Sequence, residues 1–340
     1  WFCIVYWFTF NIRWNIFRFH KNYNNRNMKN IYKNSPINLN KAKKLLKKNN
    51  IIAVPTETVY GLAGNSYSDS AVKKIYKLKK RPKKNPLIIH YYDLENLKQD
   101  VHINDKFLKL YKKFSPGALT YILQKKKGSK ISSLTNGNLK SIAVRFPSNK
   151  TIRSLLKKLN FPLAVPSANI STSVSPTKAT DVIDEFGKKI NFILDGGTSK
   201  IGLESTVISL YGKTMILRPG AINPSQIKKV LKKNISILKK SKKISSPGLL
   251  KKHYSPGIPI KLNCKKADYK AAFIVLGKKY KKNKNVFNLS YKGDLKEAGK
   301  NLYKTLRKIK KLKYKKINVI KIPNKNIGIA INDRLKRASK

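Results

Sequence analysis

Residues 54–90 read VPTETVYGLAGNSYSDSAVKKIYKLKKRPKKNPLIIH, and this stretch holds two short polar clusters that each adjoin an apolar run. The cluster at 55–61 follows the apolar run 51–54, and the basic cluster at 79–85 precedes a second apolar run. Between the clusters, Ser68 can cap a helix whose apolar residues recur at helical spacing. The stretch therefore predicts strand, polar turn, helix, basic loop and strand, and ligands of α/β folds bind where strands end in such loops.

Both polar clusters have the chemistry of a binding site. A nucleoside triphosphate carries roughly four negative charges, which Lys and Arg can offset, and Arg adds bidentate geometry. A solvated charge run is the alternative in a lysine-rich chain, but Arg81, one of few arginines and followed by Pro82, favours a site. The hydroxyls of Thr56 and Thr58 suit the polar atoms of an amino acid, and a merely capped turn is the alternative.

Two later segments carry related signals. The segment 140–147 predicts a strand that ends in Arg145. An arginine inside an apolar strand is costly unless it is paired. Its partner is either a ligand carboxylate or an Asp or Glu of the protein. The small hydroxyl residues of 166–171 and 175–177 can supply neutral donors to a phosphate, although most loops of this composition are only loops.

These and further motifs, in this order, resemble the YrdC-like family of threonylcarbamoyl-AMP synthases. The family pattern is matched by PTETVYGL at 55–62, K-x-R-P-x-x-N-P-L-I-x-H at 79–90, P-S-A-N-x-S…S-P-T at 166–177, S-T-V at 205–207, R-P-G at 218–220 and the linker S-P-G…H-Y-x-P at 246–256. Ala118 stands where the family has proline, and Thr172 where glycine is common. The resemblance covers residues 28–340 and points to the longer, two-domain members.

The resemblance implies an α/β fold of two domains. Residues 28–240 are expected to form the YrdC-like catalytic domain, a twisted mixed sheet with flanking helices. Residues 241–257 are expected to be a linker that folds over the active site. Strands and helices alternate in 258–340, which predicts a small C-terminal α/β (Rossmann-like) domain. Residues 1–27 are expected to be an extraneous or disordered N-terminal extension, because the family-like sequence begins just after Met28.

The resemblance also implies the roles of individual residues. Those expected to bind L-threonine are Thr58, His90, Arg145, Val165 and Ser205. Those expected to bind ATP are Arg81, Asn85, Ser141, Ser167, Ser175, Arg218 and Tyr254. Lys79 and Arg81 are expected to stabilise charge during catalysis, whereas no general base is assigned, with Glu57 and His90 as hypotheses. Mg²⁺ is expected to accompany ATP with few or no protein ligands.

The implied reaction joins L-threonine, bicarbonate (or CO2) and ATP to give threonylcarbamoyl-AMP and pyrophosphate. The product serves the threonylcarbamoyladenosine modification of tRNA next to the anticodon, so a downstream transferase and tRNA are implied partners. One alternative is a non-catalytic YrdC-like module that binds RNA or tRNA. Another is a carbamoyltransferase of hydrogenase maturation, which would need acylphosphatase and zinc-finger modules that this chain has neither the cysteines nor the length to hold.

Composition limits the remaining possibilities. The 340 residues include 76 Lys and Arg against 15 Asp and Glu, a formal charge of +61 that would suit a nucleic-acid binder. We favour a compositional bias toward Lys instead, because the lysines are scattered rather than grouped with Arg and aromatic residues on one face. Two cysteines form no metal spacing and agree with a reducing cytoplasm. The apolar run at the N-terminus is too short to cross a membrane as a helix.

Overall fold

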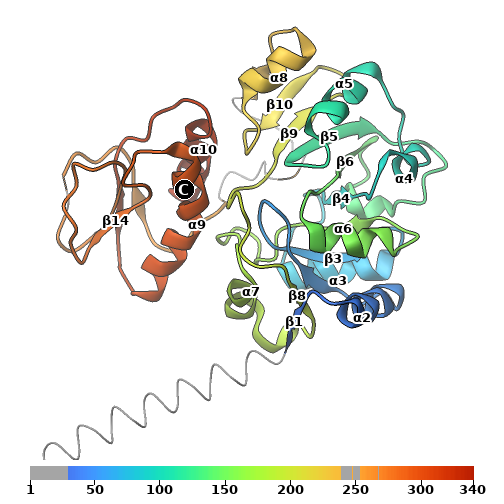
Figure 1. Ribbon diagram of the computed structural model, residues 1–340, viewed down its shortest axis with the longest axis horizontal. Helices are drawn as coiled ribbons and strands as arrows, with labels where there is room; N and C mark the ends of the chain where they lie inside the picture. The colour runs from blue at the N-terminus through green and yellow to red at the C-terminus, as the bar shows by residue number, and fades with distance from the viewer. Residues whose placement is uncertain (1–29, 239–246, 248–252, 267) are drawn as a thin grey trace, which may run out of the picture.

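The computed structural model describes most of the chain. The described residues are 30–238, 247, 253–266 and 268–340. The expected N-terminal extension, 1–27, and much of the expected linker lie outside them. Two α/β units are visible in Figure 1, a larger one followed by a smaller one. No helix in these ranges is long and apolar enough to span a bilayer.

The larger unit is built on one sheet of 11 strands in the order β1-β8-β2-β3-β7-β4-β6-β5-β9-β10-β11. The strands are β1 (Ile31–Lys33), β2 (Ile52–Val54), β3 (Gly61–Asn65), β4 (Ile88–His90), β5 (Leu119–Gln124), β6 (Ser141–Arg145), β7 (Leu163–Ala164), β8 (Ile193–Asp195), β9 (Thr206–Ser209), β10 (Met215–Arg218) and β11 (Ser236–Ile237). Parallel pairs such as β4 with β6 occur beside antiparallel pairs such as β5 with β6. The predicted mixed sheet is therefore confirmed.

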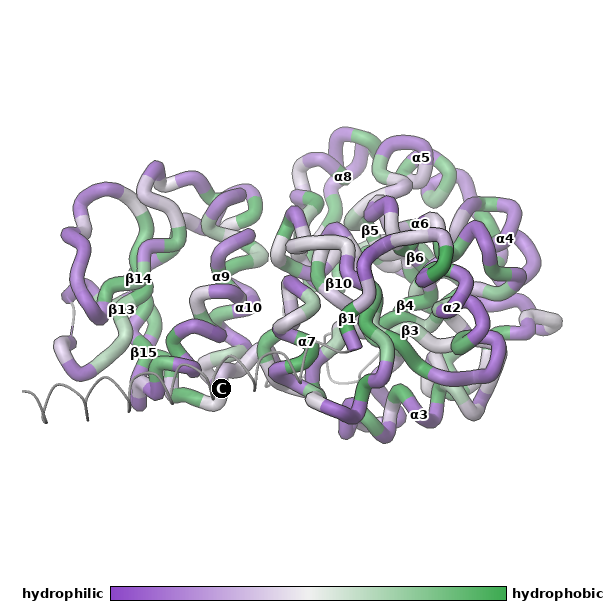
Figure 2. The backbone as a smooth tube through the Cα atoms, turned by 60° about the horizontal axis from the view of Figure 1, so that its bottom comes forward, coloured by the Kyte–Doolittle hydropathy of each residue, from purple (hydrophilic) through white to green (hydrophobic). Residues whose placement is uncertain are grey.

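Helices cover both faces of this sheet. They are α2 (Pro36–Lys47), α3 (Asp69–Lys79), α4 (Leu94–Lys98), α5 (Asp105–Phe114), α6 (Lys150–Lys157), α7 (Ala179–Phe186) and α8 (Pro224–Leu231). Alternate residues of a strand point to opposite faces. Accordingly, Ile52 and Val54 of β2 pack with α2 and α6, whereas Ala53 packs with α7. Figure 2 shows the result as apolar segments along the central strands and hydrophilic stretches around the rim.

The stretch 54–90 contains one strand more than its sequence predicts. Ser68 caps α3 as expected, with its hydroxyl accepting a hydrogen bond from the backbone N–H of Ala71. The prediction missed β3, whose sequence GLAGN has little intrinsic preference for a strand. β3 forms because it pairs with β2 on one side and β7 on the other. A Cβ on Gly61 would lie 2.4 Å from Val165 Cγ1, so glycine allows this close pairing.

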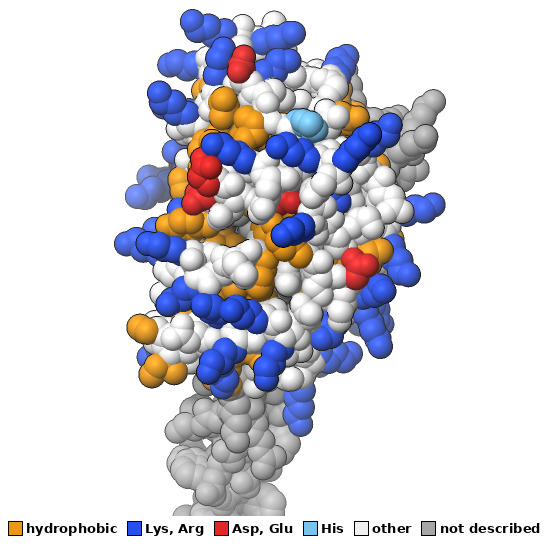
Figure 3. Space-filling view, turned by 90° about the vertical axis from the view of Figure 1, so that its right-hand side faces the viewer, with side chains coloured by type: hydrophobic (Ala, Val, Ile, Leu, Met, Phe, Trp, Pro, Cys, Tyr) orange, Lys and Arg blue, Asp and Glu red, His pale blue; other side chains and the backbone are white. Residues whose placement is uncertain are grey.

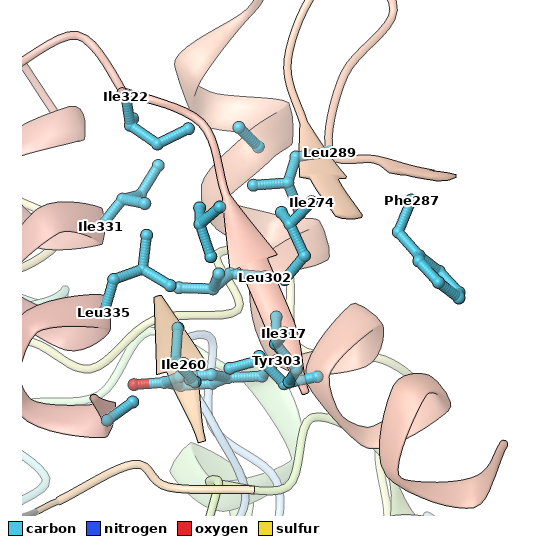
Figure 4. Close-up of a cluster of buried hydrophobic side chains, with 14 of the residues drawn as sticks. Ile260, Ile274, Phe287, Leu289, Leu302, Tyr303, Ile317, Ile322, Ile331 and Leu335 are labelled. Atoms are coloured by element: carbon cyan, nitrogen blue, oxygen red, sulfur yellow. The ribbon is translucent and has the colours of Figure 1, made fainter. Parts of the chain in front are cut away.

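The smaller unit confirms the predicted C-terminal α/β domain. Its strands β12 (Ile260–Lys261), β13 (Ala272–Val275), β14 (Val286–Asn288) and β15 (Ile317–Val319) form a parallel sheet in the order β12-β15-β13-β14. Helices α9 (Leu295–Lys311) and α10 (Gly328–Ala338) lie between this sheet and the larger unit (Figure 1). Figure 4 shows its apolar core, in which Leu302 and Tyr303 of α9 lie near Ile317 of β15.

The two units are joined by specific contacts as well as by the chain. The guanidinium of Arg307 in α9 donates to the backbone O of Val174 and pairs with Glu185 at 3.3 Å. Gly202 approaches α9 so closely that a Cβ on it would lie 2.7 Å from Lys300 Cα. The C-terminal domain is therefore packed directly on the unit that carries the motifs.

Candidate active site

The motifs converge on one cavity. The cavity lies where β4, β6, β9 and β10 meet the β2–β3 turn, the loop after β7 and the described part of the linker. Most residues predicted to bind substrates line it: Thr58, Arg81, His90, Arg145, Val165, Ser167, Ser205, Arg218 and Tyr254. Lys79, Asn85, Ser141 and Ser175 do not. The ligand roles of all these residues stay predictions, but one shared cavity is the arrangement that the motifs require.

The β2–β3 turn presents a hydroxyl of fixed polarity. Thr56 Oγ1 donates to the backbone O of Val59 at 2.6 Å and accepts from the N–H groups of Thr58 and Val59. Its only hydrogen is thus used, so Thr58 must donate in the 2.8 Å contact between the two hydroxyls. Thr58 therefore offers only acceptor lone pairs to the cavity, which suits an ammonium or hydroxyl group of a ligand.

His90, at the end of β4, brings an unpaired imidazole to the same wall. Its side chain is 1% exposed, and neither ring nitrogen has a partner among the described residues. Burial, aided by the charge of Arg145, lowers the pKa of His90 well below its usual value. The ring is therefore neutral at pH 7, with one donor and one acceptor nitrogen, and burying both without a partner is costly unless a ligand engages them.

Arg145 has a protein partner, one of the two kinds that the sequence leaves open. Its Nη2 lies 2.6 Å from Glu57 Oε1, and Nε donates to the backbone O of Gly117 at 3.2 Å. Arg145 also lines the cavity, so its expected contact with a ligand carboxylate stays a prediction beside this ion pair. Glu57 also accepts from the N–H groups of Ser148 and Asn149. Both carboxylate oxygens of Glu57 are thus engaged by the protein, and its role as a general base stays a hypothesis.

Arg81 is fixed by its own loop. Its Nε donates to the backbone O of Asn85 at 2.9 Å, and Nη2 donates to Asn85 Oδ1 and to the backbone O of Pro86, both at 2.7 Å. Burial lowers the pKa of Arg81 to about 10, so the side chain remains charged at neutral pH. Asn85 does not line the cavity, and its Nδ2 is buried without a partner in the described chain. Asn85 therefore orients Arg81 in this structure.

Arg218 ends β10 on the opposite side and is held without a carboxylate. Nε and Nη2 donate to the backbone O of Ser205 at 3.2 and 2.9 Å, and Nη2 also donates to Ser205 Oγ at 3.1 Å. Ser205 Oγ in turn lies 2.8 Å from Thr120 Oγ1. Among the described residues, no carboxylate oxygen lies within 4 Å of Arg81 or Arg218. Two buried cations with only neutral partners favour an anionic ligand.

Lys79 takes a different position from the one predicted. Its Nζ donates to the backbone O of Ser167 and of Asn169, and the side chain is 1% exposed. Burial lowers the pKa of Lys79 well below its usual value. Lys79 does not line the cavity, and its expected role in stabilising reacting charge stays a prediction. It fastens the 166–171 loop, and Ser167 of that loop does line the cavity.

Ser175 and Ser141 lie outside the cavity lining. Ser175 is fully buried and donates to Glu204 Oε1 at 2.6 Å, so it acts on a lining residue. Ser141 begins β6, the strand that Arg145 ends, which puts the two about 13 Å apart. The backbone O of Ser141 accepts a hydrogen bond from Asn136 Nδ2. The residue before Asn136, Thr135, accepts a hydrogen bond from the backbone N–H of Leu87. Ser141 is thus near the basic loop rather than in the cavity.

Glu204 and His253 are among the lining residues that the sequence did not predict. Glu204 directly precedes the S-T-V motif, and an acid beside a buried strand is a signal that could have found it. His253 precedes Tyr254 in the linker motif, its Nδ1 has no partner in the described chain, and burial lowers its pKa well below the usual value. Tyr254 is fully buried, and its hydroxyl likewise lacks a described partner. His253 and Tyr254 thus line the cavity with polar atoms that have no partner among the described residues.

Comparisons with known proteins agree with this geometry. Residues 44–220 match the Sua5/YciO/YrdC family model described as "Telomere recombination", and 222–340 match "Threonylcarbamoyl-AMP synthase, C-terminal domain". A threonylcarbamoyl-AMP synthase of Bacillus subtilis (strain 168) is 34% identical over 88% of this chain and 92% of its own length. One of Pyrococcus abyssi (strain GE5 / Orsay) is 34% identical over 86% and 92%. The crystal structure of P. abyssi Sua5 complexed with L-threonine superposes with a TM-score of 0.84 at 32% identity, covering 91% of this chain and 97% of that one.

Proposed function

This chain belongs to the two-domain threonylcarbamoyl-AMP synthases, ATP-using enzymes of the threonylcarbamoyladenosine modification of tRNA, and we propose how its cavity carries out the synthesis. The cavity binds L-threonine on the side of the β2–β3 turn and His90, and ATP between Arg81 and Arg218. One observation carries this proposal. The same cavity is lined by Arg81 and Arg218, which have no carboxylate partner, and by His90, whose ring nitrogens have no partner among the described residues.

The amino-acid side combines groups that complement threonine. Thr58 supplies an acceptor, His90 one donor and one acceptor, and Arg145 a positive charge next to Gly117. Val165, which is 4% exposed, supplies an apolar wall that suits the threonine methyl group. The solved P. abyssi Sua5 complexed with L-threonine supports L-threonine as the amino acid.

The chemical steps balance without a covalent enzyme intermediate. The threonine amine attacks CO2, or bicarbonate with loss of water, and forms a carbamate while the nitrogen loses its proton. A carbamate oxygen then attacks the α-phosphorus of ATP, and the bond to the β-phosphate oxygen breaks, so pyrophosphate leaves. Two anions must meet in this step, and Arg81 and Arg218 reduce their repulsion. The remaining gain comes from holding the reactants together.

We assign His90 as the group that accepts the proton of the threonine amine. It is neutral, lines the cavity and has free nitrogens, whereas Glu57 is tied to Arg145 and two backbone N–H groups. Mg²⁺ would reach the site with ATP and be held by phosphate oxygens. Glu204, which lines the cavity, and Glu57, next to the lining residues Thr56 and Thr58, are both ion-paired, and the described residues contain no cluster of three acidic, His or Cys side chains around a metal position.

The tRNA and the downstream transferase use the product, threonylcarbamoyl-AMP, and are not ligands of this cavity. Figure 3 shows Lys and Arg side chains spread over one whole face with few acidic ones, which favours weak, general attraction to polyanions. A non-catalytic RNA-binding module would not need Arg81, Arg218 and Ser167 around one shared cavity. Synthesis in a reducing cytoplasm agrees with the two cysteines of the sequence, which suggest no disulfide framework.

The test is threonine-dependent release of pyrophosphate by the full chain. Each reaction contains ATP, Mg²⁺ and labelled bicarbonate, together with one amino acid: threonine, serine or valine. Both pyrophosphate and the labelled adenylate are measured. We expect both products with threonine and far less with valine, which lacks the hydroxyl. Absence of both, together with tight RNA binding that persists in salt, would favour the module and overturn the proposed synthesis.

A further inference from the structure

An arginine of the C-terminal domain reaches the wall of the cavity. Arg334 in α10 is 1% exposed, and its Nε donates to Glu204 Oε2 at 2.8 Å. Glu204 lines the cavity directly before Ser205, which holds Arg218. The contact spans 130 residues of sequence and joins the two domains through a pair of buried charges.

Both oxygens of the Glu204 carboxylate have hydrogen-bond partners. Oε1 accepts from Ser175 Oγ at 2.6 Å, and Oε2 also accepts from the hydroxyl of Tyr303 at 2.7 Å. Tyr303 itself belongs to the apolar core of the C-terminal domain (Figure 4). Two of the three side chains that hold Glu204 are therefore supplied by α9 and α10.

Arg334 touches two more elements of the cavity. Its Nη1 donates to the backbone O of Pro219 at 3.0 Å, immediately after Arg218, and its guanidinium lies 4.8 Å from the ring centre of Tyr254. Asp333 accepts from Nη1 at 2.7 Å and balances part of the charge. One side chain thus contacts the segment before β9, the segment after β10 and the described end of the linker.

The ionisation of Glu204 in the cavity wall depends on these contacts with Arg334. Arg334, followed by Arg218 and the Ser175 hydroxyl, holds the pKa of Glu204 at about 2 although burial alone would raise it. Glu204 is thus ionised, and it acts electrostatically on Arg334 and on Arg218. Only Arg334 is within ion-pair distance of it in the described structure. Without Arg334, the remaining guanidinium for Glu204 to pair with would be Arg218.

We propose that Arg334 is a positioning residue for ATP: it retains the Glu204 carboxylate at the domain interface and so keeps Arg218 free for the nucleotide phosphates. This inference rests on the proposed function and gives the C-terminal domain a part in the active site. It predicts that the damage caused by losing Arg334 comes from the released negative charge of Glu204, and that removing this charge repairs it.

The experiment compares wild-type full chain with Arg334→Met, Glu204→Gln and the double variant. ATP affinity is measured directly with a fluorescent ATP analogue, and steady-state KM and kcat are measured for ATP and threonine. We expect Arg334→Met to weaken ATP binding roughly tenfold with a smaller change in the KM for threonine. In the double variant, ATP binding should recover most of that loss, which is the coupling expected of two groups that interact directly.

Matched variants separate positioning from folding. Lys336→Ala is exposed on the same helix and should leave ATP binding and thermal unfolding unchanged. Tyr303→Phe removes one donor to Glu204 without removing a charge, and it should weaken ATP binding about two- to threefold. If Arg334→Met does not fold, the Tyr303→Phe result decides, and unchanged ATP binding there overturns the inference.

The outcomes also keep this inference apart from the proposed function. Unchanged ATP affinity in Arg334→Met, or a loss that Glu204→Gln does not repair, overturns the positioning role while threonine-dependent synthesis by the wild type stands. A wild type without such synthesis overturns the proposed function, and the binding of the ATP analogue still reports whether Arg334 and Glu204 act on the nucleotide site.

Discussion

Glu57 Oε1 and Arg145 Nη2 lie 2.6 Å apart, and the two side chains are only 7% and 4% exposed, respectively. The pair links the β2–β3 turn to the end of β6, two cavity walls that are 88 residues apart in sequence. Breaking one partner of a buried ion pair leaves the other charge without compensation. The pair therefore holds the amino-acid side of the cavity together.

Glu57→Gln should consequently destabilise the protein. We expect a loss of about 3 kcal/mol in the free energy of unfolding, because Arg145 stays buried without its carboxylate. Urea denaturation measures this loss. Glu95→Gln is the control, since Glu95 pairs with Lys98 on the surface and the change should cost less than about 0.5 kcal/mol. A Glu57→Gln variant as stable as the control would contradict the role given to the pair.

Arg81→Ala should remove most synthesis without unfolding the protein. Arg81 has only neutral acceptors in its loop, so its charge is available to the triphosphate. We expect kcat/KM for ATP to fall by at least about a hundredfold. Lys83→Ala, at an exposed position of the same loop, should change it less than about twofold. Wild-type turnover by Arg81→Ala would refute the nucleotide assignment.

His90 should make the folded state sensitive to acid. Burial lowers the pKa of His90 in the folded state, whereas the unfolded chain has a pKa of about 6.5. Below pH 6.5 the unfolded state binds a proton that the folded state does not, so stability falls as pH falls, by at most about 1.4 kcal/mol per pH unit. Comparing unfolding at pH 7 and pH 5 should show a smaller drop for His90→Gln than for wild type.

The exposed His102 supplies the matched control for that measurement, because its side chain has no buried environment to lose. His102→Gln should retain the acid sensitivity of the wild type. Part of the drop should survive in His90→Gln as well, since burial also lowers the pKa of His253. An unchanged drop in His90→Gln would show that His90 is not held neutral by the fold.

Thr172 occupies the position where the family commonly has glycine, and the structure retains the glycine-like backbone with φ of 76°. A β-branched residue is strained in this region. Thr172→Gly should therefore stabilise the protein by about 1 kcal/mol in urea denaturation. The neighbouring Ser171→Gly, at a position without positive φ, should destabilise by roughly 0.5–1 kcal/mol. Equal effects of the two changes would argue against strain at Thr172.

Gly220 of the R-P-G motif is needed for close contact rather than for flexibility. A Cβ there would lie 2.5 Å from backbone atoms of Glu204, Ser205 and Thr206. Gly220→Ala should push this segment away, disturb the hold of Ser205 on Arg218, and cost about 2 kcal/mol in stability together with most ATP binding. Gly128→Ala, with no atom within 4 Å of the added Cβ, should be neutral in both measurements.

The local sequence was sufficient for several elements. Ser68 caps α3 where its spacing predicts, and the apolar residues of α3 face the core. Short-range signals work here because a cap and a helical face are set by residues three or four positions apart. β3 was missed because GLAGN forms a strand only when β2 and β7 lie beside it.

The sequence by itself determined the order of the motifs, the residue types that a nucleotide and an amino acid require, and the two α/β domains. Only the tertiary structure decided which charge meets which. It paired Arg145 with Glu57, turned Lys79 toward two backbone carbonyls, and brought Arg334 to Glu204. The physical reason is that a buried charge is stabilised by groups within a few ångströms, and the fold brings these groups together from segments far apart in the chain.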